Sequence, residues 1–174
     1  INILGEGGRH RQTLFLFDSG RDMLERDKKS HGVPADLKGY DFLKKEQIEF
    51  YKKETDALMK KYGHADSMMY MHIAFPEFAE VFKEVEGGRY EPTGEYEVLY
   101  GEQWESVGCS PYNSGMFDAI AEKGTTRAVF VGHDHVNDWC AIYKGVHLTY
   151  NLPGGYAVYN LGDKTGKPET EWVE

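Results

Sequence analysis

The stretch that decides the fold is Ala128-Val129-Phe130-Val131-Gly132-His133-Asp134-His135. It begins as a short, continuous apolar run, which predicts a strand buried on both faces of a sheet. Two similar runs occur earlier, at residues 14–17 and 67–74. Strands of this kind belong to sheets that are covered by helices, so these three runs predict an α/β fold.

The segments around these runs predict helices and a change of topology near the C-terminus. Apolar residues recur at helical spacing over residues 44–62 and 113–123, and a glycine follows each segment as a stop signal. Pro76 predicts the start of a short helix that extends to about residue 85. Short β-prone runs at residues 141–144, 146–150 and 156–161 are separated by glycines and a proline. We therefore expect one layered α/β domain over residues 1–174, flanked by helices, with an antiparallel C-terminal meander.

Two polar segments interrupt this pattern. Residues 21–39 are charged and contain glycine and proline, which predicts a long surface loop, and long loops in compact domains often carry function. Residues 87–109 hold five glutamates against a single arginine, Arg89. They predict an insertion or flap that would disfavour polyanions near a site. A solvated surface excursion without a function explains the same composition equally well.

Composition excludes several classes of protein. The chain has 174 residues, of which 40% are hydrophobic and 14% aromatic, so it is too rich in core-forming side chains to be disordered. Apolar runs stay well below the roughly 20 residues that span a bilayer, and no signal-peptide pattern is visible, so no membrane partner is expected. The formal net charge of −9 argues against a nucleic-acid partner, because phosphates are bound by positive charge. Cys109 and Cys140 either form a disulfide or remain free thiols, of which free thiols are the more frequent case.

Histidines at the ends of two predicted strands are the strongest chemical signal. His133 and His135 follow the strand of residues 128–132, and His72 lies at the end of the run of residues 67–74. Imidazole is a good ligand for zinc, iron and related metals, and neighbouring strand ends open into the same crevice. Histidines in a polar turn are also common as solvated surface residues. Three of them at two strand ends favour a metal site.

Several motifs, taken together and in order, resemble the C-terminal half of the calcineurin-like metallophosphoesterases, in the branch related to purple acid phosphatases. They are Phe17-Asp18-Ser19-Gly20, Gly39-Tyr40-Asp41, Met71-His72-Ile73-Ala74-Phe75-Pro76-Glu77-Phe78, Asn113-Ser114-Gly115-Met116-Phe117 and Val131-Gly132-His133-Asp134-His135-Val136-Asn137-Asp138. The similarity extends over most of the chain.

This resemblance implies a sandwich of two sheets and a centre of two metal ions, such as Fe, Zn or Mn, that hydrolyses phosphomonoesters or phosphodiesters. His72 and His133 would share one ion, and His135 would bind its neighbour. Asn113, Asp134 and Tyr40 would lie near a small phosphoester substrate. The resemblance also implies export to the periplasm or the extracellular space, although the sequence itself leaves the location open.

The chain departs from the family pattern ahead of His72. The motifs D-x-H, G-D and G-N-H, which in the family supply the bridging aspartate, the asparagine ligand and the usual catalytic histidine, do not precede it. No catalytic residue is therefore assigned, and the isolated chain is expected to be inactive. Two interpretations stay open: the chain is part of a longer phosphoesterase whose N-terminal half belongs to the same precursor, or it is a truncated module that binds a metal or a partner without catalysis.

Overall fold

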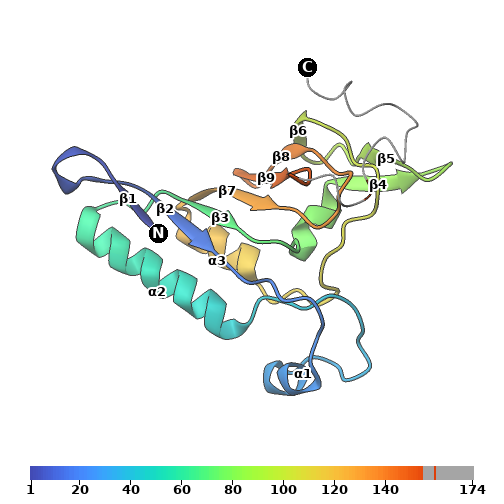
Figure 1. Cartoon of the computed structure of the whole chain (residues 1–174), viewed down its shortest axis with the longest axis horizontal. Helices are drawn as coiled ribbons and strands as arrows, with labels where there is room; N and C mark the ends of the chain where they lie inside the picture. Colours follow the sequence, from blue (N-terminus) through green and yellow to red (C-terminus); the bar gives the residue numbers. More distant parts are fainter. Residues whose placement is uncertain (155–158, 160–174) are drawn as a thin grey trace.

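The computed structural model describes residues 1–154 and 159, and its centre is a mixed seven-stranded sheet (Figure 1). In spatial order its strands are β1 (Asn2–Leu4), β2 (His10–Leu16), β3 (Ser67–Tyr70), β7 (Thr126–Val131), β9 (Val146–Tyr150), β8 (Cys140–Tyr143) and β6 (Glu97–Tyr100). The four strands β2, β3, β7 and β9 are parallel, whereas β1 and the pair β8 and β6 run antiparallel to their neighbours. A second, two-stranded sheet pairs β4 (Phe82–Val85) with β5 (Arg89–Pro92).

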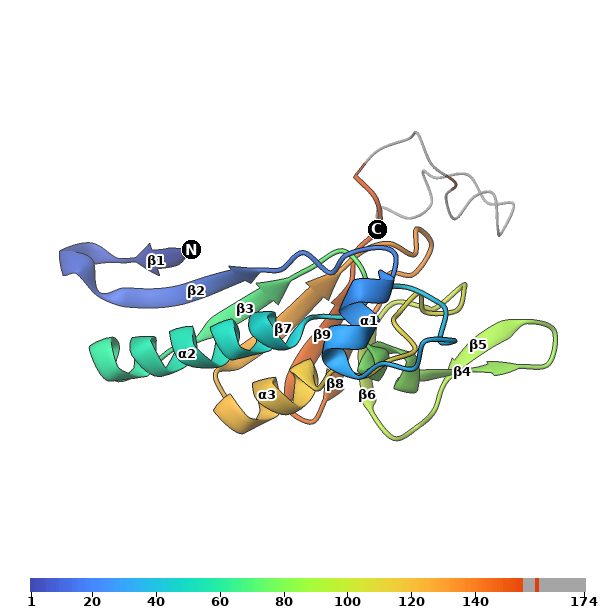
Figure 2. The same ribbon diagram turned by 90° about the horizontal axis from the view of Figure 1, so that it is seen from below.

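Helices α2 (Lys45–Tyr62) and α3 (Met116–Lys123) lie along one face of the large sheet (Figures 1 and 2). The fully buried Tyr51 of α2 contacts Phe15 of β2 edge to face, with 5.1 Å between the ring centroids. Phe117 of α3 contacts Tyr143 of β8 in the same way at 4.7 Å. The main core therefore lies between these helices and the sheet. The remaining helices are α1 (Glu25–His31) and the 3₁₀ helices η1 (Glu6–Gly8) and η2 (Pro76–Glu80).

The predicted stop of the longest helix is confirmed. Gly63 follows Tyr62 with φ of 77°, a left-handed conformation that side chains other than glycine adopt at a cost. Its N–H donates to the carbonyl of Met59 at 2.9 Å, which satisfies one of the free carbonyls at the end of the helix.

The other face of the sheet is also apolar. Side chains alternate along a strand, so the residues next to the core residues in sequence point away from α2 and α3. On β2, β3 and β7 this outer row is Leu14, Leu16, Met68, Tyr70 and Phe130. Tyr70 and Phe130 stack at 4.9 Å between ring centroids, and Leu16 keeps 64% of its surface exposed. We call these five residues the outer apolar row.

The α/β class, the flanking helices and the antiparallel strands near the C-terminus are confirmed. The antiparallel part consists of β9, β8 and β6, whereas β9 itself runs parallel to β7. The last predicted strand, residues 156–161, lies outside the described residues apart from Tyr159. Both cysteines are free thiols in the structure, and none of the described helices is long and apolar enough to cross a membrane.

Two local predictions need correction. Residues 21–39 are not only a loop, because they contain α1; this helix buries only Lys28, so it leaves no apolar periodicity to detect. The helix predicted from Pro76 ends at Glu80, and Phe82–Val85 forms β4 instead. Residues 87–109, for which the sequence predicts an insertion or flap, contain the two strands β5 and β6.

Candidate functional site

His72 and His133 lie next to each other because their strands are parallel neighbours. His72 follows β3 and His133 follows β7, and the N–H of Gly132 donates to the carbonyl of His72 at 3.0 Å. The two imidazole rings are 5.2 Å apart between centroids and nearly perpendicular. The structure therefore brings together two of the three predicted ligands at the carboxyl ends of the parallel strands, where open α/β sheets bind their ligands.

The backbone around His133 is strained. His133 has φ of 77°, a left-handed conformation that costs a residue with a side chain roughly 1–2 kcal/mol. Such strain tends to occur at functional sites. A Cβ added to Gly132 would meet His72 Nδ1 at an ordinary 3.7 Å, so position 132 has room for a side chain. The position that requires glycine is Gly108, where a Cβ would lie 2.6 Å from Cδ2 of His133.

His135 joins the other two histidines in one cavity of about 290 Å³ at the strand ends. Its ring stacks on Tyr159 with 4.6 Å between centroids, and its backbone N–H donates to the Tyr159 hydroxyl at 3.4 Å. Nδ1 of His135 is buried and has no hydrogen-bond partner within the described part of the chain. A buried ring nitrogen without a partner is open to a metal ion or a water molecule.

A second cavity of about 520 Å³ adjoins the first and shares His133 and His135 with it. Tyr40 lines this second cavity, and its ring contacts His133 edge to face at 4.6 Å between centroids. Glu105 lines it as well. Burial lowers the pKa of His133. The charge of Asp134 partly offsets this lowering, and the neighbouring histidines His72 and His135 reinforce it. A lowered pKa keeps this imidazole neutral near pH 7, and the neutral form is the one that binds metals.

Asp134 is held within the protein. Its Oδ2 accepts hydrogen bonds from the N–H of Gly108 at 2.8 Å and from the hydroxyl of Tyr150. Burial raises the pKa of Asp134, whereas these two hydrogen bonds lower it. Asp134 lines the second cavity, but its accepting oxygen already holds residues 108 and 150 in place. Its predicted contact with a substrate stays a prediction.

Asn113 lies away from the histidines and lines neither of their cavities. Its Nδ2 donates to Glu77 at 2.8 Å, and its Oδ1 accepts from the N–H of Gly115, just ahead of α3. Burial raises the pKa of Glu77, and the hydrogen bond from Asn113 opposes that rise. In the structure Asn113 thus connects η2 to the start of α3.

The ligand set is incomplete within the described residues. No group of three or more His, Cys, Asp or Glu side chains in this part of the chain is arranged to hold a metal ion. Among the described residues, none that lines the cavity with the three histidines carries a carboxylate. Imidazole nitrogens suit zinc or iron, but a centre of two ions also needs anionic ligands. The residues present fit part of a metal site.

The rest of the histidine motif holds the neighbouring acidic segment, which sequence reasoning missed. Asn137 is fully buried, and its Oδ1 accepts from the N–H groups of Trp104 and Glu105 at 2.9 and 3.1 Å. Asp138 accepts from the N–H of Glu102 at 3.2 Å. The two polar residues that follow Gly-His-Asp-His after one valine were the available signal, but sequence alone does not show which backbone they bind.

Comparison with known proteins finds relatives of one family. The chain is 31% identical over 155 residues to probable inactive purple acid phosphatase 29 of Arabidopsis thaliana, and 34% identical over 128 residues to probable inactive purple acid phosphatase 14 of the same plant. These alignments cover 84% and 69% of this chain. The chain is homologous to part of the purple acid phosphatase-like proteins. Phosphatase DCR2 of Saccharomyces cerevisiae is 29% identical over 128 residues, or 74% of the chain.

The similarity to purple acid phosphatase-like proteins covers only part of each relative. The chain spans about a third of the length of the two plant proteins, 34% and 29%, and about a fifth of the yeast protein, 19%. The matched region is the C-terminal part of these relatives. The purple acid phosphatase family is generally metal-dependent. No family model and no solved structure matches the chain.

Proposed function

We propose that this chain is the C-terminal part of a metal-dependent phosphoesterase and that it supplies imidazole ligands to a centre of two metal ions. His72 and His133 would bind one ion of the Fe, Zn or Mn type, and His135 would bind the second. The observation that carries this proposal is the convergence of these three side chains on one cavity at the ends of adjacent parallel strands. The family relationship supports the reaction class.

Two such ions, held in part by His72, His133 and His135, would supply an activated water molecule for phosphoester hydrolysis and positive charge to offset that of the phosphoryl group. The chain's own residues contribute the neutral imidazoles and the shape of the cavity. Tyr40 borders the second cavity beside His133, where it can contact a substrate that reaches the ions. Because the chain carries a formal charge of −9, a small phosphoester fits this site better than a nucleic acid.

The missing ligands would come from another part of the same longer protein. The described residues that line the histidine cavity include no carboxylate, and the chain spans about a third of its plant relatives. The outer apolar row supports the same conclusion, because an apolar sheet face of this kind is normally covered by a further layer. We infer that the upstream half of the protein covers this row and completes the metal centre.

A second candidate is a module without catalytic activity. The relatives compared above from Arabidopsis are named as probable inactive purple acid phosphatases. A protein that had lost its carboxylate ligands but kept three histidines would bind metal weakly and hydrolyse nothing.

Two measurements test the proposal. In the first, Co²⁺ and Zn²⁺ are titrated into the 174-residue chain and into the variant His133→Ala. We expect weak binding by the chain, at least tenfold weaker binding by the variant, and no turnover of an aryl phosphate. His147→Ala is the matched control, since His147 lies exposed on β9. Equal metal binding by all three proteins would overturn the assignment of the ligands.

In the second measurement the full-length protein is assayed with the same aryl phosphate. Metal-dependent turnover that His133→Ala abolishes would establish the enzyme. Metal binding that needs His133 but gives no turnover would favour the module without catalytic activity.

A further inference from the structure

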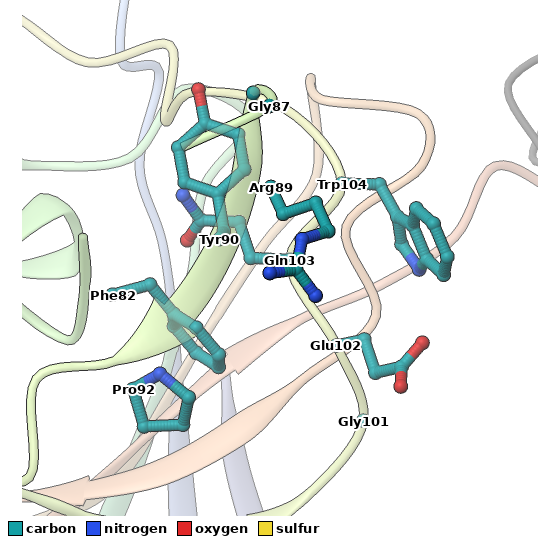
Figure 3. A pocket seen from close by; sticks show the side chains of 10 residues that line it. Phe82, Gly87, Arg89, Tyr90, Pro92, Gly101, Glu102, Gln103 and Trp104 are labelled. Atoms are coloured by element: carbon teal, nitrogen blue, oxygen red, sulfur yellow. The ribbon is translucent and has the colours of Figure 1, made fainter. Parts of the chain in front are cut away.

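A separate cavity of about 700 Å³ lies between the β4–β5 ribbon and residues 101–104 (Figure 3). It shares no lining residue with the two cavities around the histidines. Its volume falls within the range of about 300–1,000 Å³ that is typical of small-molecule sites. Neither the sequence motifs nor the proposed metal centre accounts for it.

Gln103 gives this cavity an unused polar group. The residue is only 6% exposed, and its Oε1 is buried without a hydrogen-bond partner within the described residues. A buried carbonyl oxygen left unpaired costs about 1–3 kcal/mol. A ligand that donates a hydrogen bond to this oxygen would recover that cost on binding.

The other lining groups combine apolar surfaces with two opposite charges. Phe82, Tyr90 and Pro92 supply ring surfaces, and Arg89 and Glu102 supply one positive and one negative group, as the side chains in Figure 3 show. The guanidinium of Arg89 is also 3.8 Å from the carboxylate of Glu91. Two carboxylates near one arginine, in a chain of net charge −9, disfavour an anionic ligand.

We propose that this cavity binds a neutral carbohydrate of one or two sugar rings. A sugar ring presents an apolar C–H face that can pack on Tyr90 or Phe82. Hydroxyl groups around its edge both donate and accept, so they can pair with the Gln103 amide, the Arg89 guanidinium and the Glu102 carboxylate in one orientation. A purely apolar ligand would leave Gln103 unpaired, and a phosphorylated or carboxylated one would meet the carboxylate of Glu102 and an arginine already close to Glu91.

The experiment uses the full 174-residue chain and saturation-transfer NMR with isothermal titration. The neutral probes are cellobiose, maltose and methyl glucoside, and the anionic probes are glucuronate and inorganic phosphate. We expect at least one neutral sugar to bind more tightly than either anion. Gln103→Leu keeps the volume of the side chain but removes its hydrogen bonds, so it should weaken binding about tenfold.

Two further variants separate this site from general destabilisation and from the metal centre. Arg89→Ala changes a side chain that is 73% exposed, so it should fold normally and still weaken sugar binding several-fold. His133→Ala should leave sugar binding unchanged. Absence of binding by every neutral sugar, tighter binding of an anion, or equal binding by wild type and Gln103→Leu would each overturn the proposal.

Discussion

The side chain of Asn137 makes two hydrogen bonds with the backbone of Glu105, one in each direction. Its Oδ1 accepts from the N–H at 3.1 Å, and its Nδ2 donates to the carbonyl at 3.2 Å. An amide side chain can replace a neighbouring strand in this way, because it offers the same donor and acceptor as a peptide group. This residue of the histidine motif thereby fixes the acidic segment beside the histidine cavities.

Replacing Asn137 with alanine should destabilise the protein. The change leaves the half-buried backbone N–H groups of Trp104 and Glu105 without this partner, at a cost of about 1–3 kcal/mol. Urea unfolding followed by circular dichroism measures the loss. Asn151→Ala is the control, because Asn151 is exposed and makes one long hydrogen bond of 3.3 Å; it should change stability by less than about 0.5 kcal/mol. Equal losses in the two variants would contradict the role of Asn137.

His10 should make the stability of the chain depend on pH. Burial lowers the pKa of His10 from its ordinary 6.5, and His64 lowers it further, whereas Asp66 raises it. Between the lowered pKa and pH 6.5 the unfolded chain binds more protons at this residue than the folded chain does. The contribution of His10 is therefore complete above pH 6.5 and is lost as the pH falls through that window.

The variant His10→Phe tests this expectation, because it removes the titrating group but keeps a ring to stack on Tyr62. Its unfolding free energy should fall less steeply than that of the wild type as the pH drops below 6.5. Thr13→Val removes the hydrogen bond between His10 and Thr13 but leaves the histidine, so it should keep the wild-type slope. Parallel slopes for wild type and His10→Phe would show that another group controls the pH dependence.

Cys109 should react slowly with alkylating agents. Burial, followed by the charges of Asp134 and Glu77, raises the pKa of its thiol from 9.0 to about 11. At pH 8 this leaves about 100-fold less thiolate than an ordinary cysteine has. Mass spectrometry of the Cys109 peptide after iodoacetamide treatment, from pH 7 to 10, measures the rate. The rate should keep rising with pH over this range, and unfolding in urea should restore the ordinary profile; a plateau near pH 9 in the folded chain would contradict the raised pKa.

The outer apolar row should make the isolated chain associate with itself. Leu16→Glu places a charge in this row at a site that is already 64% exposed. It should reduce dye binding and light scattering without lowering the free energy of unfolding by more than about 0.5 kcal/mol. Met59→Glu makes the same type of change on the exposed side of α2, where Met59 is 43% exposed, and should have little effect on association. The same reduction in both variants would show only a general effect of charge.

The fold could be predicted where the sequence pattern is local. The apolar runs that became β2, β3 and β7 are short, continuous and bounded by turns, and the helix ending at Tyr62 carries both a periodic face and a glycine stop. In contrast, α1 has no apolar face, and β6 joins the sheet through pairing with β8, about 40 residues further along the chain. Long-range pairing of that kind has no local signature.

The candidate site was predictable to the same extent. Strand ends and histidine spacing indicated that His72 and His133 would meet, and their rings do lie side by side. The glycine at 108 could not be assigned, because the need for it arises from a contact with a residue 25 positions away. The role of Asp134 could not be assigned for the same reason. It depends on hydrogen bonds with Gly108 and Tyr150, which lie far from Asp134 in the sequence.

Glu105 should control access of anions to the complete enzyme, if the proposed function holds. Among the five glutamates at positions 91, 95, 97, 102 and 105, it alone lines a cavity shared with His133 and His135. Its carboxylate lies beside the path that a phosphoester would take and repels long anionic substrates. In the full-length protein, Glu105→Gln should therefore raise kcat/KM for polyanionic substrates more than for a small aryl phosphate.

Salt and a matched variant separate this effect from a change in structure. The gain should shrink as the salt concentration rises, because the Debye length falls to about 8 Å at 0.15 M. Glu97→Gln is the control, since Glu97 lies on β6 and lines none of the cavities described here. If both variants leave kcat/KM unchanged at low salt, the acidic segment is scaffold. If both raise it equally, the effect belongs to net charge and not to the position of Glu105 beside the histidines.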